Sequence, residues 1–120
     1  MHAILLIAHG SRHAPANDDL RHVAGELRGR GHGLVVASFL ELAEPTIDEG
    51  GRLCVAAGAA RVVLVPYFLS PGVHVRRDLT AARDRLNERY PGVDVRLAEP
   101  LGRHPLLIEV VTERAREALG

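Results

Sequence analysis

The chain has 120 residues, of which 47% are hydrophobic and 25% charged, and its 15 basic and 15 acidic side chains cancel. These values are typical of a globular protein with one core, so we expect a single domain over residues 1–120. The balanced charge does not indicate nucleic acid or an anionic membrane as a partner, and the 3% of aromatic residues disfavours a base-stacking surface. The one cysteine, Cys54, excludes an intrachain disulfide and a cysteine-rich metal site, and its apolar surroundings predict a buried core residue.

No apolar run reaches the roughly 20 residues that a membrane-spanning helix needs. The first residues, Met1–Ala8, lead directly into an apolar run without a basic start or a cleavage site. We therefore expect no signal peptide and a cytoplasmic location.

Four short apolar runs alternate with four longer amphipathic segments. The first run is continuously apolar, as in a strand buried on both faces of a parallel sheet, and the third is the most apolar and is expected near the centre. The fourth alternates polar and apolar residues, which favours a sheet edge. The four predicted strands are Ala3–Ala8, Leu34–Phe39, Val62–Phe68 and Val93–Leu97.

Helix signals fill the segments between these runs. Pro15 suits a first turn, and Asp18 and Asp19 are expected near the N-terminus of the same helix, which Gly29 and Gly31 end. The apolar side of this helix has i, i+3, i+4, i+7 spacing. Its members are Leu20, Val23, Ala24 and Leu27.

The second helix is expected to start at Pro45, because Thr46 and Glu49 have capping-box spacing, and Gly50-Gly51 weakens its middle. The third helix is expected to end at Pro91-Gly92. The fourth starts near Pro105. Apolar positions on the third and fourth helices are Val75, Leu79, Ala82 and Leu86, and Leu107, Val110, Val111, Ala115 and Ala118.

This order predicts an α/β fold, (βα)₄, with a four-stranded parallel sheet flanked by helices and right-handed crossovers. Leu106 and Ile108 lie off the main apolar side of the fourth helix, which gives more apolar surface than one packing face needs. We therefore expect a homodimer that covers this surface.

Ligands of open parallel sheets bind beyond the carboxyl ends of the strands, so the four loops that follow the strands form the candidate site. This edge carries four of the seven histidines. They are His9, His13, His74 and His104.

Two of these histidines are candidate metal ligands. His9 directly follows a buried strand, with Gly10 allowing close approach beside it, and His74 stands where the third helix begins after Pro71-Gly72. Taken singly, His9 also fits a hydrogen-bonded structural histidine and His74 a solvated loop residue. Together they suit a late first-row divalent metal, with Glu41 as a third ligand or proton acceptor or else a solvated carboxylate. Such a set leaves coordination positions open, as a metal that must leave requires.

Arginines at the same edge could bind a polyanion that bears several carboxylates, together with nearby helix N-termini. Each alone also fits a solvated surface charge. They are Arg12, Arg76, Arg77 and Arg103. The sequence contains no His-Glu-x-x-His, Gly-x-Gly-x-x-Gly or Walker motif, so neither a zinc protease nor a nucleotide site is indicated.

Three segments resemble the short sirohydrochlorin chelatases of the CbiX/SirB group, the class II chelatases. They are Ala8–Arg12 (AHGSR), Phe39–Ile47 (FLELAEPTI) and Val65–Val75 (VPYFLSPGVHV). The resemblance covers almost the whole chain. It implies a chelatase-type parallel α/β domain that pairs as a homodimer and inserts Co²⁺, Fe²⁺ or Ni²⁺ into sirohydrochlorin without a nucleotide.

The resemblance also implies roles for individual residues. The two metal-handling histidines match His9 and His74, and the acidic position matches Glu41 less securely because Glu44 lies three residues on. The loop residues expected to contact the tetrapyrrole are Ser11, Arg12, Ser70, Gly72 and Arg76.

Two other functions stay open at this point. A histidine phosphatase also carries His-Gly after its first strand, but it has an arginine where this chain has Ala8. The second open function is a flavodoxin-like module that binds a metal or a tetrapyrrole without turnover. The residue types do not choose between cobalt, iron and nickel, or between siroheme, cobalamin and the nickel cofactor of methanogenesis.

Overall fold

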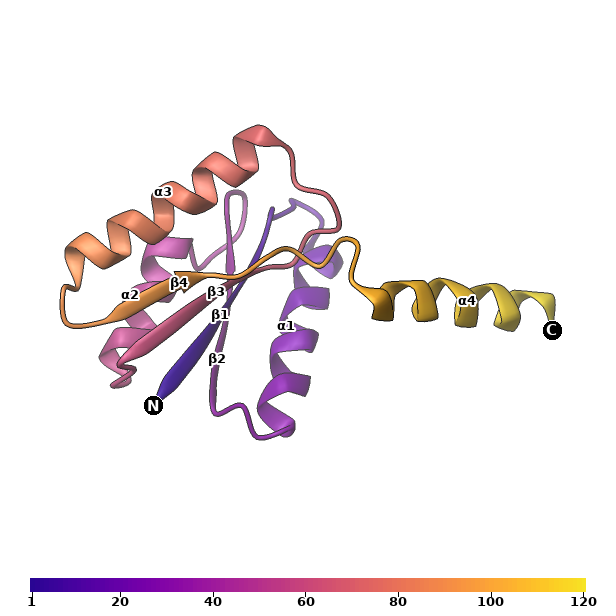
Figure 1. Cartoon of the computed structure of the whole chain (residues 1–120), viewed down its shortest axis with the longest axis horizontal. Coiled ribbons are helices and arrows are strands. Elements are labelled where there is room, and N and C mark those ends of the chain that lie inside the picture. Colours follow the sequence, from indigo (N-terminus) through magenta and orange to yellow (C-terminus); the bar gives the residue numbers. More distant parts are fainter.

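The computed structural model describes residues 1–120 and contains four strands that alternate with four helices (Figure 1). The predicted α/β class is confirmed, and each strand boundary lies within one or two residues of its expected position. In chain order the elements are β1 (His2–Ala8), α1 (Ala14–Gly29), β2 (Leu34–Phe39), α2 (Ile47–Ala56), β3 (Arg61–Pro66), α3 (Val73–Arg89), β4 (Asp94–Leu97) and α4 (Pro105–Leu119).

All four strands run parallel, in the order β2-β1-β3-β4. Leu5 in β1 pairs with Val36 of β2 and Leu64 of β3. β1 and β3 therefore have neighbours on both sides, which explains their apolar sequences. β4 pairs with β3 alone and exposes Asp94 and Arg96, so the predictions of a central third strand and an edge fourth strand are confirmed.

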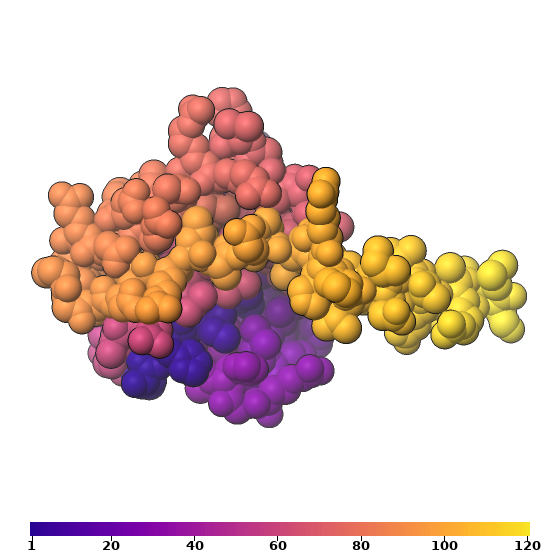
Figure 2. All heavy atoms as spheres, in the orientation of Figure 1, coloured from indigo at the N-terminus to yellow at the C-terminus, as the bar shows by residue number.

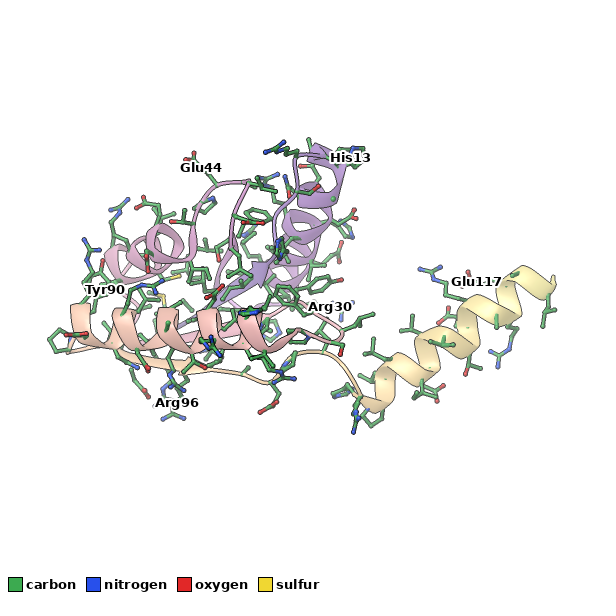
Figure 3. All side chains as sticks on the ribbon, turned by 90° about the horizontal axis from the view of Figure 1, so that it is seen from above. His13, Arg30, Glu44, Tyr90, Arg96 and Glu117 are labelled. Carbon is green, nitrogen blue, oxygen red and sulfur yellow. The ribbon has the colours of Figure 1, made fainter.

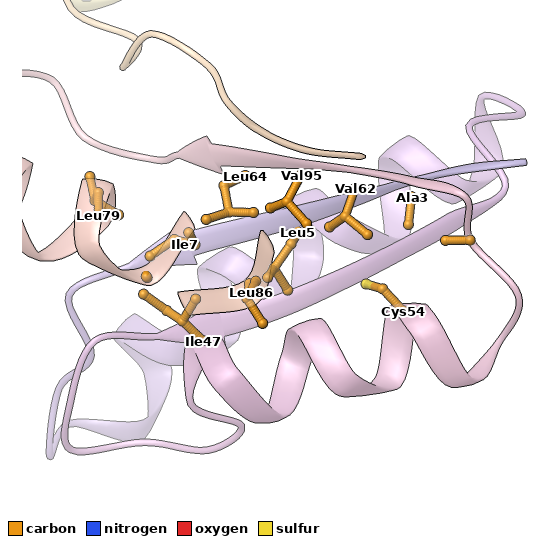
Figure 4. Close-up of a cluster of buried hydrophobic side chains, with 12 residues drawn as sticks. Ala3, Leu5, Ile7, Ile47, Cys54, Val62, Leu64, Leu79, Leu86 and Val95 are labelled. Atoms are coloured by element: carbon orange, nitrogen blue, oxygen red, sulfur yellow. The ribbon is translucent and has the colours of Figure 1, made fainter. Parts of the chain in front are cut away.

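The larger core lies between the sheet and the helices α2 and α3 (Figure 4). Two adjacent glycines let α2 approach its neighbours closely. A Cβ atom at Gly50 would lie 2.7 Å from Cδ1 of Leu5, and one at Gly51 would lie 2.6 Å from Cδ2 of Leu86 in α3. The glycine pair that weakens the helix is thus the feature that lets it pack here. Cys54 is fully buried in this core, as predicted, and burial raises the pKa of its thiol to about 11.

The helix α1 covers the opposite face of the sheet, over β1 and β2. Leu20 and Ala24 of α1 are buried there, in a smaller core with residues of both strands. These strand residues are Leu6, Val35 and Phe39.

Helix starts follow the local sequence with two exceptions. The expected start of the second helix at Pro45 lies two residues too early, because Thr46 is the N-cap of α2 and Ile47 its first residue. Thr46 caps α2 by accepting a hydrogen bond from the backbone N–H of Glu49, as the capping-box spacing predicts. Pro15 lies in the first turn of α1, also as predicted. The expected position of Asp18 and Asp19 at the N-terminus of α1 is wrong, because α1 starts at Ala14 and its first turn contains no acidic residue.

Three helices flank the sheet, but α4 does not. It projects from the body (Figures 1 and 2), has no buried residue and makes no substantial contact with another element. The longest extent of the molecule is consequently 53 Å, against 33 and 28 Å in the other directions. None of the four helices combines the length and the apolar character needed to cross a membrane.

Candidate functional site

The loops that follow β1, β2 and β3 are joined by backbone hydrogen bonds. Parallel pairing continues past the strand ends, since the N–H groups of Leu40 and Glu41 donate to the carbonyl oxygens of Ala8 and His9, both at 3.0 Å. On the other side, the N–H of Tyr67 donates to the carbonyl of Ile7 at 2.7 Å. The loop carrying His9 is therefore bonded to the loop after β2, and the end of β1 just before it is bonded to the start of the loop after β3.

His9 and Glu41 form the one direct contact between predicted site residues. Nε2 of His9 lies 2.8 Å from Oε1 of Glu41, and both side chains are more than half exposed, at 55% and 58%. Gly10 makes this approach possible, because its φ is +98° and a Cβ there would lie 1.7 Å from the carbonyl oxygen of Glu41. The structure thus presents an imidazole–carboxylate pair to solvent at the end of β1.

The loop between β1 and α1 is clamped by Asn17, a residue that the sequence reasoning missed. Asn17 is only 8% exposed, and its side chain accepts from the N–H of Ser11 at 2.9 Å and donates to the carbonyl of Ser11 at 2.7 Å. The hydroxyl of Ser11 accepts a further bond from the N–H of His13 at 3.0 Å. A signal existed, since Asn17, Leu20 and Ala24 have the spacing of one helix face, and a polar residue on a buried face needs a partner.

The loop after β2 places Glu41, and not Glu44, beside His9. Leu42 has a φ of +63°, and the N–H of Ala43 donates to the carbonyl of Glu41 at 2.8 Å, so the chain turns sharply after Glu41. The carboxylate of Glu44 forms no ion pair. Figure 3 shows its side chain extending away from the body.

His74 is the second residue of α3 and is exposed, as expected. No hydrogen bond or ion pair joins it to His9 or Glu41, and no three His, Cys, Asp or Glu side chains lie close enough together to share a metal ion. Asp78, one turn further along the same side of α3, lines a cleft of about 360 Å³ with Leu40 and Thr46. The side of α3 that carries His74 therefore faces the loop that carries Glu41.

The other residues predicted to contact the tetrapyrrole lie at the start of α3 and on its far side from His74. Gly72 is the N-cap of α3 and supplies no side-chain cap, and Ser70 is exposed. The N–H groups of both residues donate to no other group in the chain. Arg76 lies on the far side of α3 from His74, where it lines a cavity of about 210 Å³ with Arg83.

The four arginines predicted for this edge are all exposed, and none of them takes part in an ion pair. They are Arg12, Arg76, Arg77 and Arg103. His104 has a structural role instead, since its Nδ1 accepts from the N–H of Leu106 and caps α4 at 3.1 Å.

Large apolar side chains are also exposed on the loops after β2 and β3 and at the start of α3. They are Leu42, Tyr67, Leu69 and Val73, which are 40% to 69% exposed. An edge that combines unpaired arginines with exposed apolar side chains can bind a ligand with apolar faces and several negative groups. The imidazole–carboxylate pair adds a metal ligand or a proton acceptor.

Comparison with known proteins identifies the family. A family model described as CbiX matches residues 3–118. The chloroplastic sirohydrochlorin ferrochelatase of Arabidopsis thaliana is 35% identical over 117 residues, which cover 97% of this chain and 52% of that protein. The crystal structure of a CbiX protein from Marinobacter aquaeolei VT8 has a TM-score of 0.86 and 34% identity, and the match covers 99% of this chain and 98% of that one.

A longer relative has the same fold over part of its length. The sirohydrochlorin chelatase SirB from Bacillus subtilis subspecies spizizenii, solved in complex with cobalt, matches with a TM-score of 0.87 at 30% identity, over 97% of this chain and 50% of that one. The chain thus spans about half the length of SirB and of the Arabidopsis protein, and nearly all of the Marinobacter protein. The family model covers almost every residue, and sequence and fold agree with it, so this chain belongs to the CbiX family.

Proposed function

We propose that this chain catalyses the insertion of a divalent metal ion, Co²⁺, Fe²⁺ or Ni²⁺, into sirohydrochlorin without using a nucleotide. Its relatives support both substrates, since the Arabidopsis protein is named a sirohydrochlorin ferrochelatase and SirB is a sirohydrochlorin chelatase solved with cobalt. The observation that carries the proposal is the exposed pair of His9 and Glu41 at the end of β1.

His9 is proposed to receive the metal through Nδ1. An ionised Glu41 can only accept a hydrogen bond, so a neutral His9 donates through Nε2 and keeps its lone pair on Nδ1. A carboxylate that orients a histidine in this manner is common around protein-bound metals, where the other ring nitrogen binds the ion. His74 is the proposed second ligand, since it lies one turn before Asp78, which lines the cleft between α3 and the loop after β2.

Insertion also requires that the pyrrole nitrogens lose protons. Glu41 and a neutral His74 are the proposed acceptors, since both are exposed at the edge where the ring would lie. The same groups do not form a closed shell of three or four protein ligands. An ion held by so few groups exchanges readily, which a metal that must pass to the tetrapyrrole requires.

The proposed tetrapyrrole lies over the loops after β2 and β3. Its ring faces would contact the exposed apolar side chains, such as Leu42 and Leu69. Its peripheral carboxylates would bind the unpaired arginines and the free N–H groups of Ser70 and Gly72. Ser11 is a further candidate for such a contact, because its hydroxyl accepts a bond from the N–H of His13 and keeps its own O–H to donate to a carboxylate.

The decisive experiment is anaerobic incubation of the protein with sirohydrochlorin and each divalent ion in turn, followed by absorbance. We expect spectral conversion faster than in the protein-free mixture. His9→Ala and His74→Ala should each lower the rate by about 10²-fold or more, the range for a lost acid–base or ligand group. His32→Ala is the matched control, since this exposed histidine lies at the opposite edge of the sheet and should turn over like the wild type.

Two results would overturn the proposal. A double variant that lacks both imidazoles and inserts metal at the wild-type rate would remove their roles. Stoichiometric binding of metal or tetrapyrrole without turnover would favour a non-catalytic binding module.

Pairing as a homodimer belongs to the same proposal, supported by the exposed apolar side chains of α4. A cytoplasmic location, and the absence of nucleic-acid and membrane partners, stay predictions from the sequence.

A further inference from the structure

Asp78 lies one turn after His74 on α3, on the same side of the helix. Side chains four residues apart on a helix have Cβ atoms about 5–6 Å apart. At this spacing two side chains can bind one ion, as the two histidines on the helix of many zinc proteases do. His74 and Asp78 are both exposed, and neither takes part in an ion pair. Both are therefore free to close on the same ion.

Asp78 is also the carboxylate of its cleft that has no counter-ion. The cleft has a volume of about 360 Å³ and lies between α3 and the start of α2, where Asp48 is its other acidic residue. Arg85, two turns after Asp78 on α3, donates to Oδ1 of Asp48 through Nε and Nη2, both at 3.3 Å. The arginine of the cleft is thus engaged by Asp48, and the charge of Asp78 is left for a ligand.

We propose that His74 and Asp78 together bind the incoming divalent ion and hold it before it reaches the tetrapyrrole. The inference rests on the proposed function, because this ion is the substrate metal. Imidazole and carboxylate together bind iron in many non-heme sites, so the ligand types suit a late first-row ion. No third His, Cys, Asp or Glu lies close enough to complete a protein shell. Water fills the remaining positions, and the ion can leave.

The two-residue site on α3 lies across the cleft from the loop that carries Glu41. Leu40, which directly precedes Glu41, lines the same cleft as Asp78. The edge of the sheet therefore carries two combinations of an imidazole and a carboxylate. His9 and Glu41 form one of them, in direct contact at 2.8 Å, and His74 and Asp78 form the other. An ion released from α3 has His9 as its next protein ligand.

Two neighbouring features work against a purely electrostatic account. Arg77, three residues after His74, adds an unpaired positive charge on this part of α3. The N-terminus of α2 borders the cleft and, as the positive end of a helix, attracts the carboxylate of Asp78 for a structural reason. Net charge thus does not bring a cation to His74, and the proposal requires direct ligation by both side chains.

The first test is a Co²⁺ titration without sirohydrochlorin, followed by ¹H–¹⁵N NMR in a His9→Ala background that removes the other imidazole. We expect Co²⁺ to shift or broaden the amide signals around His74 and Asp78. Adding Asp78→Asn should raise the Kd at least about tenfold, as the loss of a group around a metal does. Asp84→Asn is the matched control, since it removes the same charge from α3 outside the cleft and should bind as the background does.

Three outcomes of this titration would overturn the proposal. The first is a His9→Ala protein that binds no Co²⁺ at α3. The second is an Asp78→Asn protein that binds Co²⁺ as tightly as its background. The third is binding that disappears at about 1 M salt, where charges are screened beyond about 3 Å and only direct ligation survives.

The second test is the rate of metal insertion as a function of Co²⁺ concentration, with thermal unfolding measured on the same proteins. Asp78→Asn should raise the KM for Co²⁺ at least about tenfold and leave kcat unchanged, because it removes binding and not chemistry. A lowered Tm with a wild-type KM would assign Asp78 to the stability of α2 and overturn the proposal. If the wild type binds Co²⁺ at α3 but inserts none, the chelatase proposal fails; if it inserts Co²⁺ and Asp78→Asn keeps the wild-type KM, only the role of Asp78 fails.

Discussion

Replacing Gly10 by alanine tests how far the site depends on backbone contact between two loops. The added Cβ would lie 1.7 Å from the carbonyl oxygen of Glu41, whereas real contacts of this kind are essentially never below 3.0 Å. The two loops must therefore separate by about 1.3 Å or more. His9 precedes this position and Glu41 carries the opposing carbonyl, so their 2.8 Å contact cannot survive unchanged.

Two magnitudes follow from this geometry. A non-glycine residue at a φ of +98° costs about 1–3 kcal/mol of folding free energy before the clash is added. For a chain of this size that lowers Tm by roughly 4–12 °C. Displacement of a catalytic group by about 1 Å can lower a rate by about 10²-fold, so metal insertion should fall by about that factor.

The assays are thermal unfolding by circular dichroism and metal insertion followed by absorbance. Gly92→Ala is the matched control, because a Cβ there has no atom within 4 Å and the residue has no positive φ. We expect the control to keep the wild-type Tm and rate. A Gly10→Ala protein with wild-type Tm and wild-type turnover would refute the argument that this close approach builds the site.

Two further predictions concern other residues. Asn17→Ala leaves the backbone N–H and carbonyl of Ser11 unpaired, so it should lower the free energy of unfolding in urea by about 1–3 kcal/mol and also slow metal insertion. The control is Asn87→Ala, which breaks a similar pair of bonds to Val95 far from the site and should lower stability alone. Equal insertion rates for the two variants would contradict this prediction. Burial raises the pKa of the Cys54 thiol to about 11, so we expect it to react with a thiol reagent at pH 7 only after the protein unfolds. Rapid labelling of the native protein would count against its placement in the core.

The strands and helices were predictable because their signals are local. The apolar run of β1 reflects its central position, and the alternation in β4 reflects its place at the edge. Thr46 caps α2 as its spacing to Glu49 predicts. Parallel topology then brings the loops after the strands to one edge, which is why His9 and Glu41 could be expected near one another.

Other features were not predicted, some of them because they depend on contacts between distant residues. The apolar spacing of α4 indicated a helix that packs on the sheet, but α4 has no buried residue and makes no substantial contact with another element. The sequence also grouped Arg76 with His74, although helix geometry places them on opposite sides of α3. Asn17 was overlooked because a polar residue among helix positions is ordinarily assigned to the solvent side.

The backbone hydrogen bonds at the carboxyl edge are distributed unequally between the two halves of the site. His9 and Glu41 belong to segments that are bonded to each other in register with the sheet, so their spacing is set before any substrate arrives. His74 follows a short stretch in which Leu69, Ser70 and Gly72 donate no hydrogen bond. Under the proposed function, a macrocycle entering this edge would meet His9 held in place by the backbone and His74 on a less constrained segment.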